Sequence, residues 1–468
     1  MNDRAIDWEH VLGPILSRGE QGLGAGVCAA EIPALERATF AHARRAVRPR
    51  PGLDDDELPF PTTVVPWFTG GRFLLPDGRG EAAVRPGAFL QHAAGDYYIQ
   101  DAGSMLALAL CDVSPGQWVC DTCAAPGGKS SALLEALDGS GLLLSNEVIA
   151  SRFTALPWAL ARAGYGNYLL TQMEVDRLQE RCGPRFDRVL VDAPCSGQTM
   201  IARGKQSLAA FSRPQIEHSS ARQLRILRAA AGLVKPGGRL VYSTCSYSFA
   251  ENEQVVLAFL SECGGWQARS VPGLERWGSP AAAGCYRLWP HRDGCAGAFA
   301  AALQRVEDEP SLSLFAQARA RRRADSKHWQ PRQPGREVSD WLIEREPGQW
   351  WQYRNQLHRL SAEIPVEWIP QAAGGACIAE NKISRWEPCF GGAMLANSLC
   401  TAPQRLELSD DEASRYVAGE ALRCAAPYRD WCLASWRGRP LSWGKLTQKT
   451  LKNHFPKSLR QRQLIWHR

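Results

Sequence analysis

The sequence predicts an α/β protein built around a doubly wound, mainly parallel sheet. Between residues 115 and 305, short apolar runs alternate with helical patterns, as in repeated strand–helix units. A glycine-rich turn, Thr122–Ser130, follows the first run, and acidic residues or cysteines follow the later ones. Because ligands bind beyond the carboxyl ends of the strands in such sheets, we expect these residues to share one site.

Each element of this sheet is placed by local signals. Strands are expected at Trp118–Asp121, Gly141–Ser145, Tyr168–Thr171, Phe186–Val191 and Arg239–Tyr242, with Arg287–His291 and Ala298–Leu303 completing the sheet. Helices are expected at Ala102–Leu110, Ser131–Leu137, Ala150–Arg162 and Ile216–Leu233, the last one ending at Lys235–Gly238. Ser248–Glu251 has the pattern of a capping box and predicts a further helix that continues through Leu260.

Composition and charge describe a globular protein with room for about two to four domains. The chain has 468 residues, of which 45% are hydrophobic and 22% charged, and its net charge is +7. Nine Lys or Arg residues and no acid follow Asp430, so we expect this basic tail to attract phosphates. With no signal-like segment and no apolar run long enough to span a membrane, we expect a cytoplasmic protein with reduced thiols.

The two ends of the chain are less informative than its middle. Residues 1–95 contain a basic cluster, Leu35–Arg45, which is either a solvated surface or an RNA contact. Residues 306–340 are expected to be a linker, because the Arg- and Pro-rich text there cannot build a core. Residues 341–468 are rich in tryptophan, which predicts one or two small α+β or β-rich domains, with some rings buried and others stacking on RNA bases.

The sequence of the turn after the first strand indicates which kind of nucleotide-like ligand to expect. A P-loop NTPase is a disfavoured alternative, because its phosphate-binding loop needs a glycine where Cys123 stands, although Gly128, Lys129 and Ser130 match its end. The dinucleotide-binding glycine pattern is also absent. Glu147, at the end of the second strand, suits ribose hydroxyls, or else is an ordinary surface carboxylate. A ligand with a ribose but no essential phosphate fits S-adenosylmethionine better than ATP or NAD.

Two further features of this region leave their roles open. Either Glu174 or Asp176, after the third strand, would lie near the edge of an adenine ring. Cys120 and Cys123 form a C-x-x-C pattern, but a zinc site needs a second pair of ligands at a suitable spacing, and none is evident. We therefore expect no metal.

The fourth and fifth strands end in the cysteine motifs Asp192-Ala-Pro-Cys195 and Ser243-Thr-Cys245. Cytosine C5 is too weak a nucleophile to take a methyl group unaided, but addition of a thiolate to C6 makes C5 enamine-like; a base then removes the C5 proton and the thiol is eliminated. Cys245 would supply the thiolate, and Asp192 would supply the carboxyl group at the edge of the base. Cys195 would help with the elimination, and Lys129 would either orient Asp192 or favour the thiolate. Taken singly, each cysteine is more simply a small buried hydrophobe.

These segments, in this order, resemble the RNA cytosine-C5 methyltransferases of the Nop2/Sun (NSUN) family. The resemblance rests on D-T-C-A-A-P-G-G-K, N-E, D-A-P-C-S-G and S-T-C-S, and it covers about residues 95–305. It implies a Rossmann-like class I methyltransferase domain at 96–305, S-adenosyl-L-methionine as cofactor, Cys245 as the nucleophile and Cys195 as an aid to product release. Contacts to the cofactor or the target base are implied for Cys123, Ala124, Ala125, Pro126, Gly127, Gly128, Lys129, Glu147, Glu174 and Asp192.

A looser resemblance covers the ends of the chain. Segments such as Cys377–Lys382 and Leu408–Ala413 are similar to the bacterial 16S rRNA members of the family, which implies a PUA-like domain towards the end and a substrate in the small ribosomal subunit. Residues 1–95 would then form an α+β RNA-binding region, although Arg37–Arg44 stands where the family has an R-x-N segment. We expect RNA as the partner, neither a metal nor a membrane, and a monomeric protein.

The sequence thus predicts an S-adenosylmethionine-dependent RNA cytosine-C5 methyltransferase, with 16S rRNA as the expected substrate. A tRNA or 23S rRNA substrate is an alternative, because no motif reads the RNA. An RNA-binding assembly factor without turnover is an alternative from another class, and it would bind RNA without transferring methyl groups.

Overall fold

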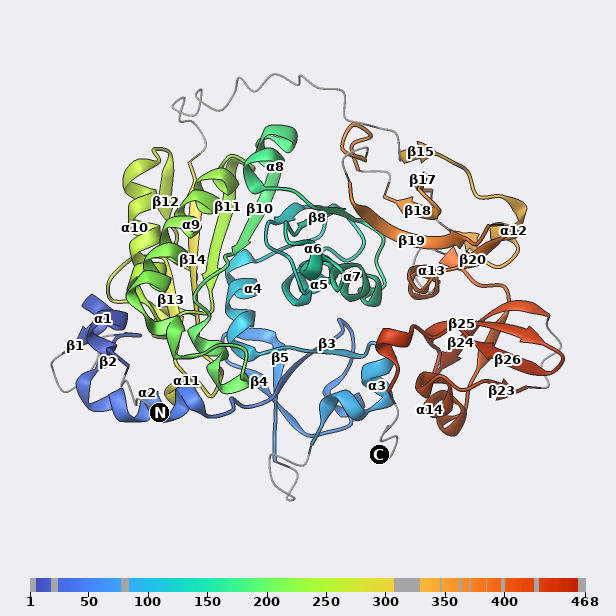
Figure 1. The fold of residues 1–468 in the computed structure, drawn as a ribbon, viewed down its shortest axis with the longest axis horizontal. Helices are drawn as coiled ribbons and strands as arrows, with labels where there is room; N and C mark the ends of the chain where they lie inside the picture. The colour runs from blue at the N-terminus through green and yellow to red at the C-terminus, as the bar shows by residue number, and fades with distance from the viewer. Residues whose placement is uncertain are drawn as a thin grey trace.

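The computed structural model describes residues 6–17, 24–76, 84–306, 329–345, 347–361, 364–369, 372–383, 385–396, 400–424 and 429–461. Figure 1 shows a central α/β domain, flanked by an N-terminal sheet in blue and by two C-terminal units in orange and red. This arrangement confirms the predicted fold class.

The central sheet carries five parallel strands, whose carboxyl ends therefore point the same way. Its strands are β7 (Trp118–Asp121), β8 (Leu142–Asn146), β9 (Tyr168–Thr171), β10 (Phe186–Asp192), β11 (Val234–Thr244), β12 (Trp266–Ala268), β13 (Cys285–Leu288) and β14 (Ala298–Arg305). Their order is β12-β14-β11-β10-β7-β8-β9, with β13 paired to β14. β7 to β11 pair in parallel, whereas β14 runs antiparallel to β11.

Alternate residues of these strands point to opposite faces of the sheet, and helices cover both faces. Leu143 and Leu190 belong to the core cluster that includes residues of α4, α5 and α7, whereas their neighbours Leu144 and Val191 pack with α8, α9 and α10. These helices are α4 (Leu106–Cys111), α5 (Gly128–Ala136), α7 (Leu156–Ala163), α8 (Val175–Cys182), α9 (Arg213–Ala231) and α10 (Glu253–Glu262). The two apolar faces fix the register of every strand, because a slip by one residue would turn its core side chains to the other face.

The predicted elements mostly coincide with the observed ones, and the differences have local causes. β7 and β9 have the predicted bounds. The single helix predicted at 150–162 is two helices, α6 (Ala150–Phe153) and α7, because Pro157 fits only the first turn of a new helix. Helix α5 begins at Gly128 rather than Ser131, so its N-terminus lies inside the glycine-rich turn.

The capping-box prediction at Ser248–Glu251 is wrong. Ser248 makes no capping bond, and α10 begins only at Glu253, after the short 3₁₀ turn Phe249–Glu251. The Glu251 side chain turns into the protein instead, where several buried donors meet it. A carboxylate surrounded by buried donors gains more from them than from one exposed backbone N–H.

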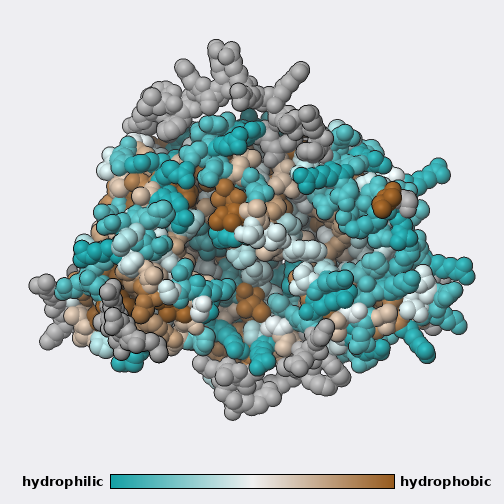
Figure 2. Space-filling view, in the orientation of Figure 1, coloured by the Kyte–Doolittle hydropathy of each residue, from teal (hydrophilic) through white to brown (hydrophobic). Residues whose placement is uncertain are grey.

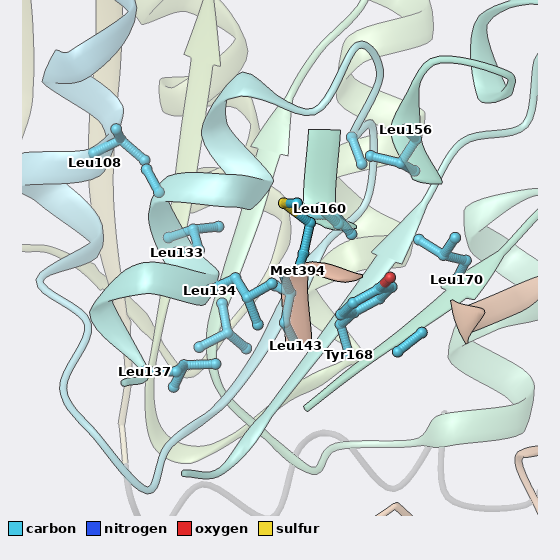
Figure 3. Close-up of a cluster of buried hydrophobic side chains, with 14 of the residues drawn as sticks. Leu108, Leu133, Leu134, Leu137, Leu143, Leu156, Leu160, Tyr168, Leu170 and Met394 are labelled. Atoms are coloured by element: carbon cyan, nitrogen blue, oxygen red, sulfur yellow. The ribbon is translucent and has the colours of Figure 1, made fainter. Parts of the chain in front are cut away.

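The sheet continues beyond β9 into the next part of the chain. β19 (Gly374–Asn381) pairs antiparallel with β9, with Gly374 opposite Leu170 and Gly375 opposite Leu169. The remaining elements of this unit are β15 (Trp329–Pro331), α12 (Arg336–Ser339), β16 (Ile343–Glu344), β17 (Gln349–Tyr353), β18 (Gln356–Leu360), β20 (Trp386–Pro388), α13 (Phe390–Leu395) and β21 (Cys400–Thr401). Met394 of α13 lies among Leu143, Leu160 and Tyr168 of the central domain, so the two parts share one core (Figure 3).

Part of the predicted linker is structured. Residues 307–328 lie outside the described residues, but β15 and α12 fall within the remainder of 306–340. The buried Trp329 ring lies 4.8 Å from the Tyr353 ring and 5.1 Å from the His358 ring, measured between centroids. One tryptophan among polar neighbours anchors this strand, which is why composition alone predicts a linker there.

Four smaller sheets complete the described structure, and two of them have more than two strands. The N-terminal sheet has the order β4-β5-β3-β6 and the last sheet the order β22-β24-β25-β26-β23. The N-terminal elements are α1 (Trp8–Leu12), β1 (Leu16–Ser17), β2 (Val27–Cys28), α2 (Ile32–Phe40), β3 (Ala46–Pro49), β4 (Thr62–Val65), β5 (Phe68–Leu74), α3 (Leu90–Ala93) and β6 (Tyr97–Ile99). Those of the last unit are β22 (Arg405–Glu407), α14 (Asp410–Ala418), β23 (Leu422–Arg423), β24 (Asp430–Trp436), β25 (Arg439–Thr447) and β26 (Thr450–Asn453). Leu90 and Ala94 share a core cluster with this last unit, which joins the two ends of the chain.

The aromatic residues of the basic tail are buried: Trp436 and Phe455 lie in the core of the last unit, and Trp443 packs against Trp341 of the preceding unit. Trp436, Trp443 and Phe455 are each at most 2% exposed. Because these rings are buried, they are unavailable for the base stacking that the sequence suggested. Arg462 and Arg468 of the tail lie outside the described residues.

The surface seen in Figure 2 is mostly hydrophilic, with apolar residues in small separate patches. Across the described ranges, no helix combines the length and the apolar character needed to cross a membrane.

Candidate active site

The ends of β10 and β11 bring the two predicted motifs together. Asp192 stands opposite Ser243 in the parallel register, and the Ser243 hydroxyl donates a hydrogen bond to Asp192 Oδ1 over 2.8 Å. Lys129, in the first turn of α5, reaches the other carboxylate oxygen, with Nζ 2.8 Å from Oδ2. Both oxygens of Asp192 are thus held, one by a hydroxyl and one by a cation.

The two cysteines beside this carboxylate are in direct contact. The Sγ atoms of Cys195 and Cys245 lie 3.0 Å apart. The hydrogen bond from Cys195 lowers the pKa of Cys245 against the opposing effects of burial and the Asp192 charge, and the Lys129 ammonium also favours the Cys245 thiolate. The same bond and burial raise the pKa of Cys195 well above the usual value for a thiol. These opposite shifts in pKa favour Cys245 over Cys195 as the thiolate of the pair.

The glycine-rich turn between β7 and α5 forms a second wall of the site. Asp121, at the end of β7, accepts hydrogen bonds from the Ser130 hydroxyl at 2.6 Å and from the Cys123 amide at 3.3 Å. Burial raises the pKa of Asp121 to about 7. Gly127 has φ +109°, and a Cβ there would lie 2.5 Å from that of Ala159, so only glycine fits.

Asp121 is a site residue that the motifs did not single out. It is the last residue of a buried strand, where a carboxylate is conspicuous, and that position is the signal that would have found it. Asp101 is a second such residue: it is buried, pairs with Arg203 at 2.8 Å and lines the same cavity. Burial raises the pKa of Asp101, against the opposing Arg203 charge.

A cavity of about 770 Å³ joins these walls. Of the predicted residues, it is lined by Cys123, Ala124, Ala125, Pro126, Gly128, Lys129, Asp192, Cys195 and Cys245. A neighbouring cleft of about 440 Å³, lined partly by Arg44 and Arg45, shares Asp101 and Arg203 with this cavity. The catalytic cavity thus adjoins a groove with several arginines, which would suit a polyanion.

Two of the predicted acids lie outside the cavity lining. Glu147 is 2% exposed; its Oε1 accepts a hydrogen bond from the Ile149 amide at 2.9 Å, and its Oε2 lies 3.4 Å from Arg152 Nη1. No donor satisfies hydrogen-bond geometry at Oε2, although Arg152, which lines the cavity, makes an ion pair with it. An acceptor left without a hydrogen bond fits a ligand that carries hydroxyl donors, such as a ribose.

Glu174 has a different environment, and its role as the cofactor acid stays a prediction. Its side chain is 56% exposed and makes an ion pair with Arg225 of α9 at 3.7 Å. Asp176 pairs with the same arginine at 2.8 Å. Because Glu174 is the residue that opens α8, the helix directs both acids towards α9 and away from the cavity. Contact of either acid with the cofactor stays a prediction.

In the described part of the chain, no group of three or more His, Cys, Asp or Glu side chains is arranged to hold a metal ion.

Comparison with known proteins places this geometry in a family. Residues 107–304 match the family model described as 16S rRNA methyltransferase RsmB/F, and residues 403–461 match the one described as the methyltransferase RsmF PUA domain. Ribosomal RNA small subunit methyltransferase F of Shigella boydii serotype 18 is 28% identical over 428 residues, which cover 85% of this chain and 84% of that protein. The protein of the same name from Escherichia coli O9:H4 is 29% identical over 423 residues, with the same coverage.

Solved structures agree with this placement. A methyltransferase homologue from Pyrococcus horikoshii has a TM-score of 0.51 and 26% identity, covering 59% of this chain and 91% of that one. NSun6 from the same organism, solved with an S-adenosylmethionine analogue, has a TM-score of 0.53 at 18% identity, covers 60% of this chain and 95% of that one, and supports the fold. The chain therefore carries an RsmB/F-type RNA methyltransferase domain over residues 107–304 and an RsmF-type PUA domain over residues 403–461.

Proposed function

We propose that this protein transfers a methyl group from S-adenosylmethionine to C5 of a cytosine in RNA, through a covalent bond between Cys245 and C6. One observation carries this proposal: two thiols in contact at 3.0 Å, with a Lys129–Asp192 pair beside them. A methyltransferase whose acceptor atom is an oxygen or an amino nitrogen has no need of a thiolate, because those atoms are already nucleophilic. A carbon acceptor does need one.

Each residue has a defined task in this reaction. The Cys245 thiolate adds to C6, and the electron pair of the C5–C6 bond becomes available at C5. The Asp192 carboxylate, held by Lys129 and Ser243, is placed to accept a hydrogen bond from the exocyclic amino group of cytosine. The electron pair at C5 would form the bond to the methyl carbon as the methyl–sulfur bond breaks, and a base would then take the C5 proton. The electrons of the C5–H bond re-form the C5–C6 double bond and expel the Cys245 thiolate, and Cys195, in contact with that sulfur, assists its release.

S-adenosylmethionine, when bound, supplies an electrophilic methyl group. The turn from Cys123 to Lys129 would hold it at the amino end of α5, where free backbone N–H groups face the cavity. Glu147 would accept hydrogen bonds from the ribose, since its Oε2 lacks a hydrogen-bond donor.

The choice of 16S rRNA rests on the relatives and on the last unit of the chain. The relatives named as small-subunit rRNA methyltransferases cover most of this chain, and the PUA match extends that similarity to residues 403–461. The arginines of the cleft beside the cavity would contact the RNA backbone. A ribosomal substrate would place the protein in the cytoplasm.

Bisulfite sequencing of total RNA from cells with and without the gene tests this proposal. The expected result is one cytosine of 16S rRNA that resists conversion only when the gene is present. Loss of protection in tRNA or 23S rRNA would leave the chemistry standing and overturn the substrate. No change at any cytosine in RNA, with RNA binding retained, would instead favour an assembly factor without turnover.

A further inference from the structure

One buried carboxylate near the active site is unexplained by the proposed reaction. Glu251 is 0% exposed and does not line the cavity, yet four donors converge on it. These donors are the Ser196 amide at 2.8 Å, the Ser196 hydroxyl at 2.5 Å, the Ser246 hydroxyl at 2.7 Å and the Gln223 side-chain amide at 2.9 Å. A charged group in this position is costly to bury without such partners, so its surroundings are built around it.

The partners of Glu251 reveal a symmetry between the two catalytic loops. Ser196 directly follows Cys195, and Ser246 directly follows Cys245. Both hydroxyls donate to the same oxygen, Oε1, and lie 3.3 Å from each other. One carboxylate therefore ties the backbone next to each thiol to a single point.

The neighbouring residue strengthens one side of this tie. Asn252 donates from its side-chain amide to the carbonyl of Ser246 at 2.8 Å and accepts from the Thr244 hydroxyl at 2.5 Å. Glu251 and Asn252 thus hold the residues on both sides of Cys245. Of these two residues, only Glu251 is hydrogen-bonded to Ser196.

We propose that Glu251 is a positioning residue that sets the separation of the two catalytic thiols. It touches neither the cavity nor any reacting atom, and it acts through Ser196 and Ser246. The role rests on the proposed function, since contact between the sulfurs matters only if both thiols take part in the reaction. Without the tie, the loops ending β10 and β11 would still be joined through Gln198 and Thr199, but Ser196 and Ser246 would lose their common acceptor. A displacement of about 1 Å at a reacting group lowers the rate on the order of 100-fold.

Glu253 provides a matched control within the same turn. It is equally buried, but its partners are Arg287 and Ser279, the latter at 2.6 Å, and neither adjoins a thiol. Replacing either glutamate by glutamine keeps the shape and removes one charge. In Glu251→Gln one accepting oxygen becomes an amide nitrogen, which cannot accept a hydrogen bond. Either the two serine hydroxyls or the Ser196 and Gln223 amides then lose their acceptor, whereas Glu253→Gln affects no partner of a catalytic loop.

The first measurement is the pH dependence of Cys245 alkylation by iodoacetamide, followed by peptide mass spectrometry on the full chain without RNA. The groups that act on Cys245 are Cys195, Asp192, Lys129 and Glu251. Loss of the Cys195 contact raises the alkylation midpoint, whereas loss of the Glu251 charge alone lowers it, because that charge opposes ionisation. The two explanations therefore predict shifts of opposite sign.

We expect Glu251→Gln to raise the midpoint and to lower kcat on the order of 100-fold, with KM for S-adenosylmethionine unchanged. Ser196→Ala and Ser246→Ala, which keep the charge and each remove one arm, should shift the midpoint in the same direction by less. They also keep the test open if Glu251→Gln fails to fold. Glu253→Gln should lose thermal stability and leave the midpoint in place.

A midpoint that falls or stays in Glu251→Gln, or equal shifts in the Glu251 and Glu253 variants, would overturn the positioning role. These outcomes are separable from failure of the proposed reaction, because alkylation requires neither RNA nor methyl transfer. A shifted midpoint without any cytosine methylation would support the tie and reject the chemistry.

Discussion

The rim of the central sheet has two halves that differ in how tightly their side chains are tied. At the ends of β10 and β11, Lys129 and Ser243 each contact Asp192 at 2.8 Å, and the sulfur atoms of Cys195 and Cys245 lie 3.0 Å apart. At the ends of β8 and β9, one acid is buried behind Arg152 and the other faces solvent.

The difference follows from how each half is built. Both halves join adjacent parallel strands in register, but in the first half the loops after the strands turn their side chains towards each other, so that Cys195 contacts Cys245. The second half places its acids one to three residues after the strands, where Glu147 turns under α6 and Glu174 opens α8. We infer that the catalytic half is preorganised, whereas the cofactor half depends on its ligand to complete it.

The largest effect should come from the nucleophile. Cys245→Ala should lower turnover by at least about 1,000-fold and abolish the covalent RNA adduct, because no other thiolate stands at that position. Turnover is measured with radiolabelled S-adenosylmethionine, and the adduct by denaturing electrophoresis. Cys263→Ala, a half-buried thiol at the end of α10 and outside the cavity, should behave as the parent protein. Activity retained in Cys245→Ala would remove the central role of the β11 motif.

The second thiol should give a different result from the first. Cys195→Ala should still form the adduct but release it slowly, so a protein–RNA species that survives denaturation should accumulate while turnover stops. The cause is loss of the group that contacts the departing sulfur at 3.0 Å. The double variant with Cys245→Ala should show no such species. If Cys195→Ala lacked the adduct and Cys245→Ala trapped it, the roles of the two strands would be exchanged.

Lys129 links the two halves, since it extends from the glycine-rich turn to Asp192. Removing its charge in Lys129→Met should raise the pKa of Cys245, because the cation favours the thiolate, and should lower kcat by about 100-fold at neutral pH. The rate should recover partly at higher pH, where the thiolate forms unaided. Lys235→Met removes a cation that pairs with Asp187 at the opposite end of β10 and should leave the pH profile unchanged. An unshifted profile in Lys129→Met would show that the two halves are electrostatically independent.

The same contrast explains what the sequence can reveal. Asp192, Cys195 and Cys245 follow buried strands by at most three residues, so strand ends and residue types suffice to bring them together. The role of Glu251 depends on partners 28 and 55 residues away, and its local pattern equally matches a capping box. Only the packed structure decides between those uses.

Outside the catalytic domain, sequence patterns do not predict the structure where a segment is held in place by one buried residue. Trp329 anchors β15 within the predicted linker, Trp436 packs in the core of the last unit, and Trp443 packs against Trp341 of the preceding unit. A tryptophan count predicts neither outcome, because burial depends on partners that arrive from other parts of the chain.

The smallest effects should lie in the cofactor half, and they test whether it is organised around Glu147. Glu147→Gln should weaken S-adenosylmethionine binding by about tenfold, the value of one hydrogen bond to a charged group, with kcat little changed at saturation. Glu174→Gln should leave the Kd unchanged, since its carboxylate is solvated and pairs with Arg225 outside the cavity. Isothermal titration of S-adenosylmethionine into each variant measures both values without RNA. Equal weakening in the two variants would mean that α8 moves on binding and brings Glu174 to the ligand; the cofactor half would then assemble around the ligand, and the contrast with β10 and β11 would be sharper still.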